Sequence, residues 1–324
     1  MNSMKERLLW LDLAKGIGIV LVVMGHTLFP LHQAIDIFHM PLFFILAGLT
    51  FRPATMENFL LKKIDSIYLP FVCFTMISLP ISFLVPHEGS FNGPLWFLQT
   101  LFVDLILIQL TYRLCDKLNT SFDITGGVIL VLSAIVAVLM LRCSNVVLPF
   151  DMTIAIRALP FILLGYLLKR FFIGTEQINK NWLLFTVTLV IYSITLGVDI
   201  KIYDATGSFA NGKIIESSPS LFYVAAIAGS FSVIAVSRLL YKVRIINWLG
   251  RNSLVIMCVH FPLVQWLNEW VSKTQLYKTG GLVEKSIIGL SIVSIGLSFG
   301  ALCAVVCKRY IPQLTGYKRN FIIL

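Results

Sequence analysis

The chain has 324 residues, of which 57% are hydrophobic and 13% are charged, and its mean hydropathy is +0.86. An ordinary soluble domain carries roughly twice that share of charged residues, so the composition excludes this class. The formal net charge of +10 does not indicate nucleic-acid binding, because the basic residues stand singly or in pairs between apolar stretches.

Apolar stretches close to the ~20 residues needed to cross a bilayer recur along the whole chain. They predict an all-α, polytopic membrane bundle of about ten helices. In chain order the expected spans are 8–29, 35–51, 67–85, 95–112, 125–141, 155–168, 182–198, 219–237, 252–271 and 286–307. The pattern is weakest at 155–168. The first stretch is not expected to be a cleavable signal peptide, because three ionisable residues interrupt it.

The connecting segments differ in charge. Lys and Arg favour the side that holds both termini by roughly three to one, which predicts that both termini are cytoplasmic. No repeat or linker divides the chain, so we expect a single domain over residues 1–324. Two outer loops, 86–94 and about 199–218, are rich in Gly, Ser or Asn, and they either cover a polar ligand or simply connect helices.

The first span contains Asp12, Lys15 and His26 in an otherwise apolar helix. Such groups are costly in lipid and usually face a cavity. Lys15 and His26 project within about 20° of one another and differ in depth by about 16 Å, with Lys15 at the cytoplasmic end. A neutral imidazole takes a proton from a hydroxyl or attacks an acyl carbonyl, and a charged lysine contacts an anion. In the structural alternative, Lys15 pairs with Asp12 and His26 caps the helix.

The second expected span begins at the same outer depth with Asp36 and His39, which either orient His26 and bind substrate or cap a helix near Pro41. The six cysteines lie mostly in or beside spans and are expected to be small core residues. No metal site is expected, because the Cys and His residues do not form a complete set of metal ligands in the sequence.

Two further residues stand out in the later spans. Trp96 belongs either to an aromatic belt at the membrane interface or to a platform on which a sugar stacks. Arg157 either pairs with a buried acid, Asp104 or Asp151, or contacts the substrate directly.

Several blocks together resemble the acyltransferase-3 family of integral-membrane O-acyltransferases, including its fucose O-acetylase-like branch. A basic residue, ten intervening residues and a histidine appear as Lys15 and His26 within the frame Asp12-Leu13-Ala14-Lys15-Gly16. The other blocks are Phe38-His39-Met40-Pro41-Leu42-Phe43-Phe44, Leu95-Trp96-Phe97-Leu98 with Leu101-Phe102, and Leu249-Gly250-Arg251-Asn252-Ser253-Leu254 running to His260. The resemblance covers nearly the whole chain. This chain departs from it at Ala47-Gly48-Leu49, where many members read Ser-Gly-Phe, and at Ser66, where a further arginine often follows the Lys62-Lys63 pair.

The resemblance implies transfer of an acyl group, most simply acetyl from cytoplasmic acetyl-CoA, to a hydroxyl of a cell-envelope glycan or lipid-linked sugar in the bacterial inner membrane. It implies no bound cofactor. Arg52, Lys62 and Lys63 would meet the donor phosphates, with Asp12 and Lys15 organising the donor end. His26 would act as base or as transient acyl carrier.

Two other functions compete with this one. Ionisable groups inside spans also mark translocation paths, so a transporter or exporter of envelope polysaccharide precursors is the main alternative. A non-catalytic assembly partner in polysaccharide export is the other.

Overall fold

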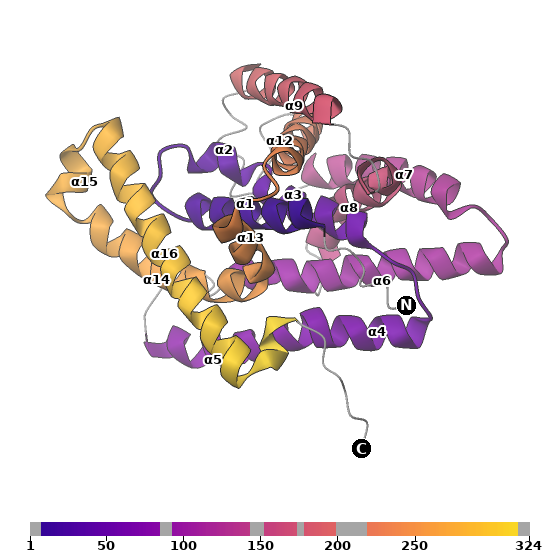
Figure 1. Ribbon diagram of the computed structural model, residues 1–324, viewed down its shortest axis with the longest axis horizontal. Helices are drawn as coiled ribbons and strands as arrows, with labels where there is room; N and C mark the ends of the chain where they lie inside the picture. Colours follow the sequence, from indigo (N-terminus) through magenta and orange to yellow (C-terminus); the bar gives the residue numbers. More distant parts are fainter. Residues whose placement is uncertain (1–7, 85–92, 143–151, 174–177, 199–218, 317–324) are drawn as a thin grey trace.

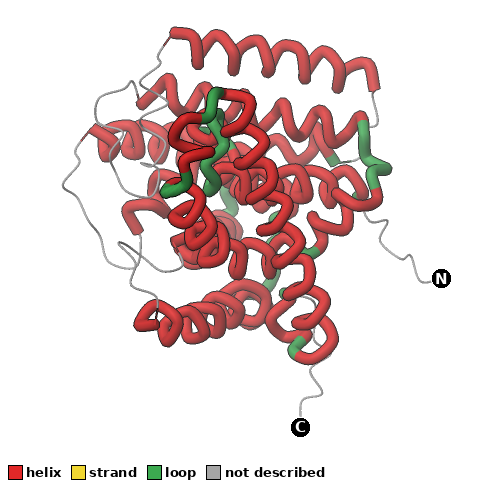
Figure 2. Tube along the Cα trace, turned by 90° about the vertical axis from the view of Figure 1, so that its left-hand side faces the viewer, coloured by secondary structure: helices red, strands yellow, loops and turns green. Residues whose placement is uncertain are grey.

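The computed structural model describes residues 8–84, 93–142, 152–173, 178–198 and 219–316. Within these ranges the chain forms helices joined by short loops and contains no strand (Figure 2). The predicted all-α class is therefore confirmed for the described part of the chain. Cys143, Asp151, the loop 199–218 and most of the loop 86–94 lie outside these residues.

The first half of the chain gives the helices α1 (Leu9–Gly25), α2 (His32–Asp36), α3 (His39–Thr50), α4 (Met56–Lys63), the π-helical turn η1 (Ile64–Tyr68), α5 (Leu69–Leu84), the 3-10 turn η2 (Gly93–Leu95), α6 (Trp96–Lys117) and α7 (Phe122–Arg142). The second half gives α8 (Met152–Phe172), α9 (Ile178–Val198), α12 (Pro219–Leu239), α13 (Arg244–Arg251), α14 (Ser253–Ser272), α15 (Gln275–Thr279), α16 (Leu282–Tyr310) and the 3-10 turn η4 (Pro312–Thr315).

Each expected span overlaps a helix, although the ends differ. Among the described residues, seven stretches are long and apolar enough to cross a membrane: His32–Thr50, Gly93–Lys117, Phe122–Met140, Met152–Phe172, Pro219–Leu239, Ser253–Ser272 and Leu282–Tyr310. A helical membrane bundle therefore fits, whereas the count of ten spans and the cytoplasmic location of both termini stay predictions. The weakest expected span is in fact the 21-residue helix α8, whose Arg157 and Pro160 interrupt its apolar pattern.

Helices α1 and α3 lie at the centre of the bundle (Figure 1). In that view α9 and α12 lie above them and α4 and α5 below, with α14 and α16 to one side and α7 and α8 to the other. Helix α1 contacts α2, α3, α12, α13, α14 and α16. Because so many elements surround it, a polar side chain on α1 meets protein rather than lipid on most faces.

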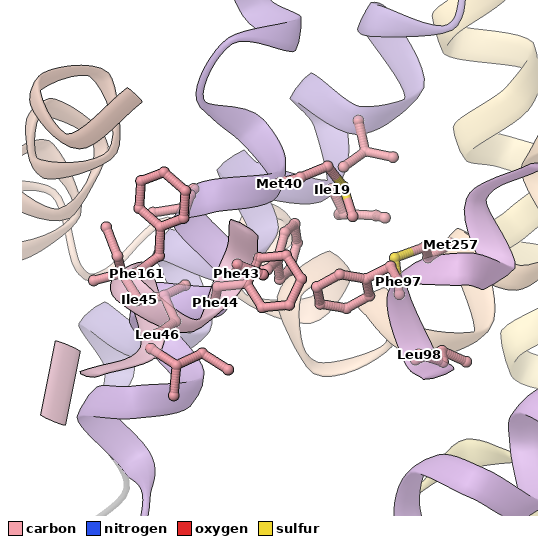
Figure 3. Close-up of a cluster of buried hydrophobic side chains, with 14 of the residues drawn as sticks. Ile19, Met40, Phe43, Phe44, Ile45, Leu46, Phe97, Leu98, Phe161 and Met257 are labelled. Atoms are coloured by element: carbon pink, nitrogen blue, oxygen red, sulfur yellow. The ribbon is translucent and has the colours of Figure 1, made fainter. Parts of the chain in front are cut away.

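An aromatic cluster joins α3 to α6. Phe97 lies edge-on to Phe43 and Phe44, with ring centroids 5.8 and 5.0 Å apart, and the three rings point toward one another in Figure 3. Such pairs contribute about 0.5–1.5 kcal/mol each beyond the area that they bury. The cluster thereby fixes the two helices that begin with His39 and Trp96.

At the other end of α1, helix α13 crosses it at very short range. A Cβ atom on Gly250 would overlap the carbonyl oxygen of Asp12, and a Cβ on Gly16 would overlap the carbonyl oxygen of Ile246. Only glycine at both positions allows the two backbones to approach so closely. This contact buries Asp12, which is 7% exposed, and sets the position of α13 beside Lys15.

Candidate active site

Helix α1 ends at Gly25, and His26 is its C-cap residue rather than a residue within the helix. The hydroxyl of Thr27 donates to the carbonyl of Met24 at 2.8 Å, which closes the last turn. Gly25 is needed there because a Cβ would overlap Oδ1 of Asp36. The chain thus places the Asp36 carboxylate directly beside the backbone that carries His26.

The His26 side chain is surrounded by rings from two other helices. It stacks on His260 of α14, with centroids 5.5 Å apart and planes 23° from parallel. His39 of α3 and Phe261 of α14 present their rings nearly perpendicular to it, at 6.2 and 5.1 Å. Three imidazoles from distant parts of the sequence therefore meet at one end of α1, and we call them the histidine cluster.

Backbone carbonyls set the hydrogen positions of two rings in the histidine cluster. Nδ1 of His39 lies 3.1 Å from the carbonyl oxygen of Ile35, and Nδ1 of His260 lies 3.0 Å from that of Ile256. A carbonyl oxygen only accepts, so each Nδ1 donates and each Nε2 holds a lone pair in the neutral ring. Both rings can therefore accept a proton at Nε2.

The Nε2 atom of His260 is buried and has no hydrogen-bond partner among the described residues. An unsatisfied buried acceptor is costly, and it becomes satisfied when a donor enters beside it. The hydroxyl of an incoming molecule is a donor of this kind. This arrangement makes His260 a second proton acceptor next to His26.

Two side chains hold the histidine cluster in place. Nδ2 of Asn268 donates to the carbonyl oxygen of His26 at 2.7 Å, which ties the end of α1 to α14. The Asp36 carboxylate lies 3.5 Å from Nδ1 of both His39 and His32. Asp36 therefore lies beside His39, one ring away from His26, and its orienting role stays a prediction.

At the opposite end of α1, Lys15 lies close enough to α4 to act on its charges. Burial lowers the pKa of Lys63 to about 8, and the positive charges of Lys62 and Lys15 add to this effect. Nζ of Lys63 also lies over the ring of Phe59, 5.4 Å from its centroid. Lys15, Lys62 and Lys63 are therefore three neighbouring cations that a bound anion would stabilise, and we call them the lysine cluster.

Arg52 is exposed and begins the connection from α3 to α4. The residue before it, Phe51, accepts a hydrogen bond on its carbonyl oxygen from Nζ of Lys169 at 2.5 Å. The cation that the structure brings to this connection is therefore Lys169 of α8. Arg52 keeps its expected role at the donor end only as a prediction.

Two predicted acceptor residues lie in other surroundings. Trp96 is half-buried and packs against Phe44 and Phe97, with ring centroids 6.5 and 6.3 Å apart. Arg157 is 3% exposed, and its Nε has no hydrogen-bond partner among the described residues. Its carbonyl oxygen accepts from the hydroxyl of Tyr223 at 2.9 Å.

The expected pairing of Arg157 with Asp104 is wrong. Both carboxylate oxygens of Asp104 are buried without a hydrogen-bond partner among the described residues, and no ion pair joins the two side chains there. The reason is that one polar residue in each of two spans fixes neither the rotation nor the depth of either helix. The other proposed partner, Asp151, lies outside the described residues.

Sequence reasoning assigned no role to His260 or Asn268. Both lie in the expected span 252–271, where a polar residue in an apolar helix is the same signal that identified His26. Within the described residues, no group of three or more His, Cys, Asp or Glu side chains is placed to hold a metal ion. The five described cysteines are free thiols, of which Cys115 and Cys258 are buried, as small core residues would be.

The described residues form a helical membrane bundle in which three imidazoles meet at one end of α1. A family model described as "Acyltransferase domain" (Acyl_transf_3) matches residues 8–309. The chain therefore belongs to the acyltransferase-3 family, which confirms the resemblance read from its motifs. Its place in the fucose O-acetylase-like branch stays a prediction. No curated protein and no solved structure gave a significant match.

Proposed function

We propose that this protein transfers an acetyl group from cytoplasmic acetyl-CoA to a hydroxyl of a cell-envelope glycan or lipid-linked sugar at the bacterial inner membrane. The observation that carries the proposal is the convergence of the histidine cluster at one end of α1, with the lysine cluster at the other. Membership of the acyltransferase-3 family supports the acyl-transfer chemistry itself.

The lysine cluster suits the donor. Coenzyme A carries several phosphate charges, which Lys15, Lys62 and Lys63 would neutralise, relieving the repulsion that they exert on one another. His26 lies about 16 Å farther along α1 by helical rise, a distance that an extended pantetheine arm covers. The thioester then reaches the imidazoles while the phosphates stay at the cytoplasmic end.

In the base route, one imidazole is sufficient. Nitrogen of His26 takes the proton from the acceptor hydroxyl as its oxygen attacks the thioester carbon. A carbon–oxygen bond forms, the carbon–sulfur bond breaks, and the proton passes from His26 to the departing thiolate. Asn268 fixes the backbone of His26, and the stacked His260 limits the rotation of its ring.

In the covalent route, a second imidazole is needed. A nitrogen of His26 attacks the thioester carbon, the carbon–sulfur bond breaks to leave an acetyl-imidazole, and the ring proton goes to the departing thiolate. The acceptor hydroxyl then attacks the acetyl carbon and the carbon–nitrogen bond breaks. The hydroxyl proton must first go to another base, because His26 carries the acetyl group, and that base returns it to the released His26 ring. The free Nε2 of His260 is the nearest acceptor whose lone pair the backbone fixes.

Rapid-quench trapping separates the two routes. Purified full-length protein is mixed with acetyl-labelled acetyl-CoA in the absence of acceptor, then denatured within milliseconds and digested for mass spectrometry. The covalent route gives a labelled peptide containing His26 in the wild type and in His260→Gln, where the second step is blocked. No label in either protein would leave the base route.

Glycan analysis tests the proposal as a whole. Cells that lack the protein, or that express His26→Ala, should lose one acetyl mass from a surface glycan, whereas cells expressing His32→Ala should keep it. His32 is the matched control because it is a half-exposed histidine bound to the same carboxylate, Asp36, outside the ring contacts of His26. Unchanged acetylation with His26→Ala would contradict acyl transfer and favour an exporter.

A further inference from the structure

A cavity lies where α13, α14 and α16 meet, and no residue of the lysine cluster lines it. It has a volume of about 340 Å³ and is lined by Trp248, Asn252, Ala304, Val305, Lys308 and Arg309, from α13, α14 and α16. None of the residues assigned above to the donor or to the reaction lines it. The proposed donor and acetyl-transfer residues therefore do not account for this cavity.

The polar half of the cavity is built for an anion. Lys308 and Arg309 are exposed on the last turn of α16. The 20-residue helix α14 begins beside them, and its N-cap residue Asn252 makes no cap, because its Nδ2 donates instead to the carbonyl of Trp248 at 2.8 Å. Asn252 is also the C-cap residue of α13, so the positive charge of the cavity comes from the two cations, and this charge favours phosphate.

The other half of the cavity is apolar and continues onto the outer surface of α16. Ala304 and Val305 lie one turn before the two cations. Val305 is 53% exposed, and Leu302 is 62% exposed one turn farther along. Because α16 is among the helices that can span a membrane, this exposed surface meets acyl chains. Trp248 completes the site as a half-buried indole at the polar boundary, where membrane proteins favour tryptophan.

We propose that this cavity binds an anionic phospholipid, with the phosphate beside Lys308 and Arg309 and an acyl chain along Val305. Basic pockets between helices on the cytoplasmic side are typical sites for acidic lipid headgroups. A bound lipid would clamp α13 against α16, and α13 is the helix that crosses α1 at Gly16. The site therefore stabilises the end of the bundle that carries Lys15.

Native mass spectrometry of the full-length protein in detergent tests the site. The protein is titrated with dioleoyl phosphatidylglycerol and, separately, with dioleoyl phosphatidylcholine. One basic residue near an anionic lipid contributes about fivefold in affinity, so Lys308→Gln/Arg309→Gln should weaken binding of the first lipid about 30-fold. The matched control Lys117→Gln/Lys242→Gln removes two exposed cations from outside the cavity and should leave binding unchanged.

Two further measurements distinguish a lipid from a soluble phosphate as the ligand of the cavity. Coenzyme A, added as a water-soluble competitor, should not displace phosphatidylglycerol, and Val305→Asn should weaken the lipid several-fold without changing coenzyme A binding. Displacement by coenzyme A, or equal losses in the cavity variant and the control, would overturn the proposal. So would equal affinity for the two lipids. Unchanged thermal unfolding in lipid-free detergent verifies that each variant is folded, and none of these results depends on acetyl transfer.

Discussion

The two ends of α1 differ in how firmly their functional side chains are held. In the histidine cluster, His39 and His260 are buried, and each donates a hydrogen bond to a backbone carbonyl. In the lysine cluster, the side chains are long and only partly buried, and Lys63 reaches an aromatic ring rather than a hydrogen-bond acceptor. Chemistry needs fixed geometry, whereas recognition of a flexible polyphosphate tolerates movement.

This difference predicts separate kinetic signatures. Changes in the histidine cluster should lower kcat, because they affect groups that act in the transition state. Changes in the lysine cluster should raise the KM for the donor and leave kcat alone, because they affect binding that is uniform along the reaction. Four experiments can break or sharpen this division.

The largest effect is expected for His26→Ala. Loss of the central imidazole should lower kcat for acetyl transfer about 100- to 10,000-fold, because proton transfer or acyl capture at this position disappears. Purified protein with labelled acetyl-CoA and an acceptor sugar provides the measurement. A variant that retained a third of the wild-type kcat would remove His26 from the chemistry.

His260→Gln should lower kcat by about 10- to 100-fold, with the donor KM within twofold of wild type. The glutamine keeps a polar group at the position of Nε2 but cannot take up a proton, so the acid limb of the kcat–pH profile should also change shape. Cys258→Ala, a change at a neighbouring buried position of α14, is the matched control and should leave the profile as it is. The same profile in both variants would reduce His260 to a packing residue.

Lys62→Gln/Lys63→Gln should raise the KM for acetyl-CoA about tenfold at unchanged kcat, because two charge-assisted contacts to phosphate are lost. Steady-state kinetics in detergent or nanodiscs measures this. The control Lys117→Gln/Lys242→Gln makes the same change in net charge away from the cluster. A fall in kcat rather than a rise in KM would mean that the two ends of α1 are not functionally separate.

The smallest effect concerns pH. The pKa of Lys63 is about 8, below its ordinary value, because burial and the charges of Lys62 and Lys15 disfavour the protonated amine. Lys63 is therefore mostly cationic below pH 8 and mostly neutral above it, so binding of a phosphate in that range is accompanied by uptake of a proton by Lys63. The donor KM should rise about fivefold between pH 7 and 9. Lys63→Arg keeps its charge and should flatten this rise, so an equal slope in that variant would assign the titration elsewhere.

Much of the first span could be predicted from the sequence. The positions of Lys15 and His26 along α1 follow from helical geometry alone, and the charge near α4 follows from the family resemblance. The span expected from the apolar stretch continued to residue 29, whereas α1 ends at Gly25, as in the alternative in which His26 caps the helix. His26 is consequently a C-cap residue whose backbone carbonyl is available to Asn268.

The contacts between helices that are far apart in the chain could not be predicted from the sequence. His260 is separated from His26 by most of the chain, and only the packing of α14 on α1 brings the rings together. The lack of information on such contacts also explains why a pair between Arg157 and Asp104 was one of the alternatives. A periodic pattern shows which residues are polar but not which ones meet. Membership of the family narrows the chemistry without supplying these contacts.

The hydrogen bond from Asn268 to the His26 carbonyl has a mechanical consequence. Helix α14 carries the His260 ring, and its Asn268 side chain also binds the backbone carbonyl of His26. A tilt of α14 would displace both imidazoles as one rigid pair, while His39 remained anchored on α3. Such a tilt would then change the distance between the stacked pair of rings and the ring of His39.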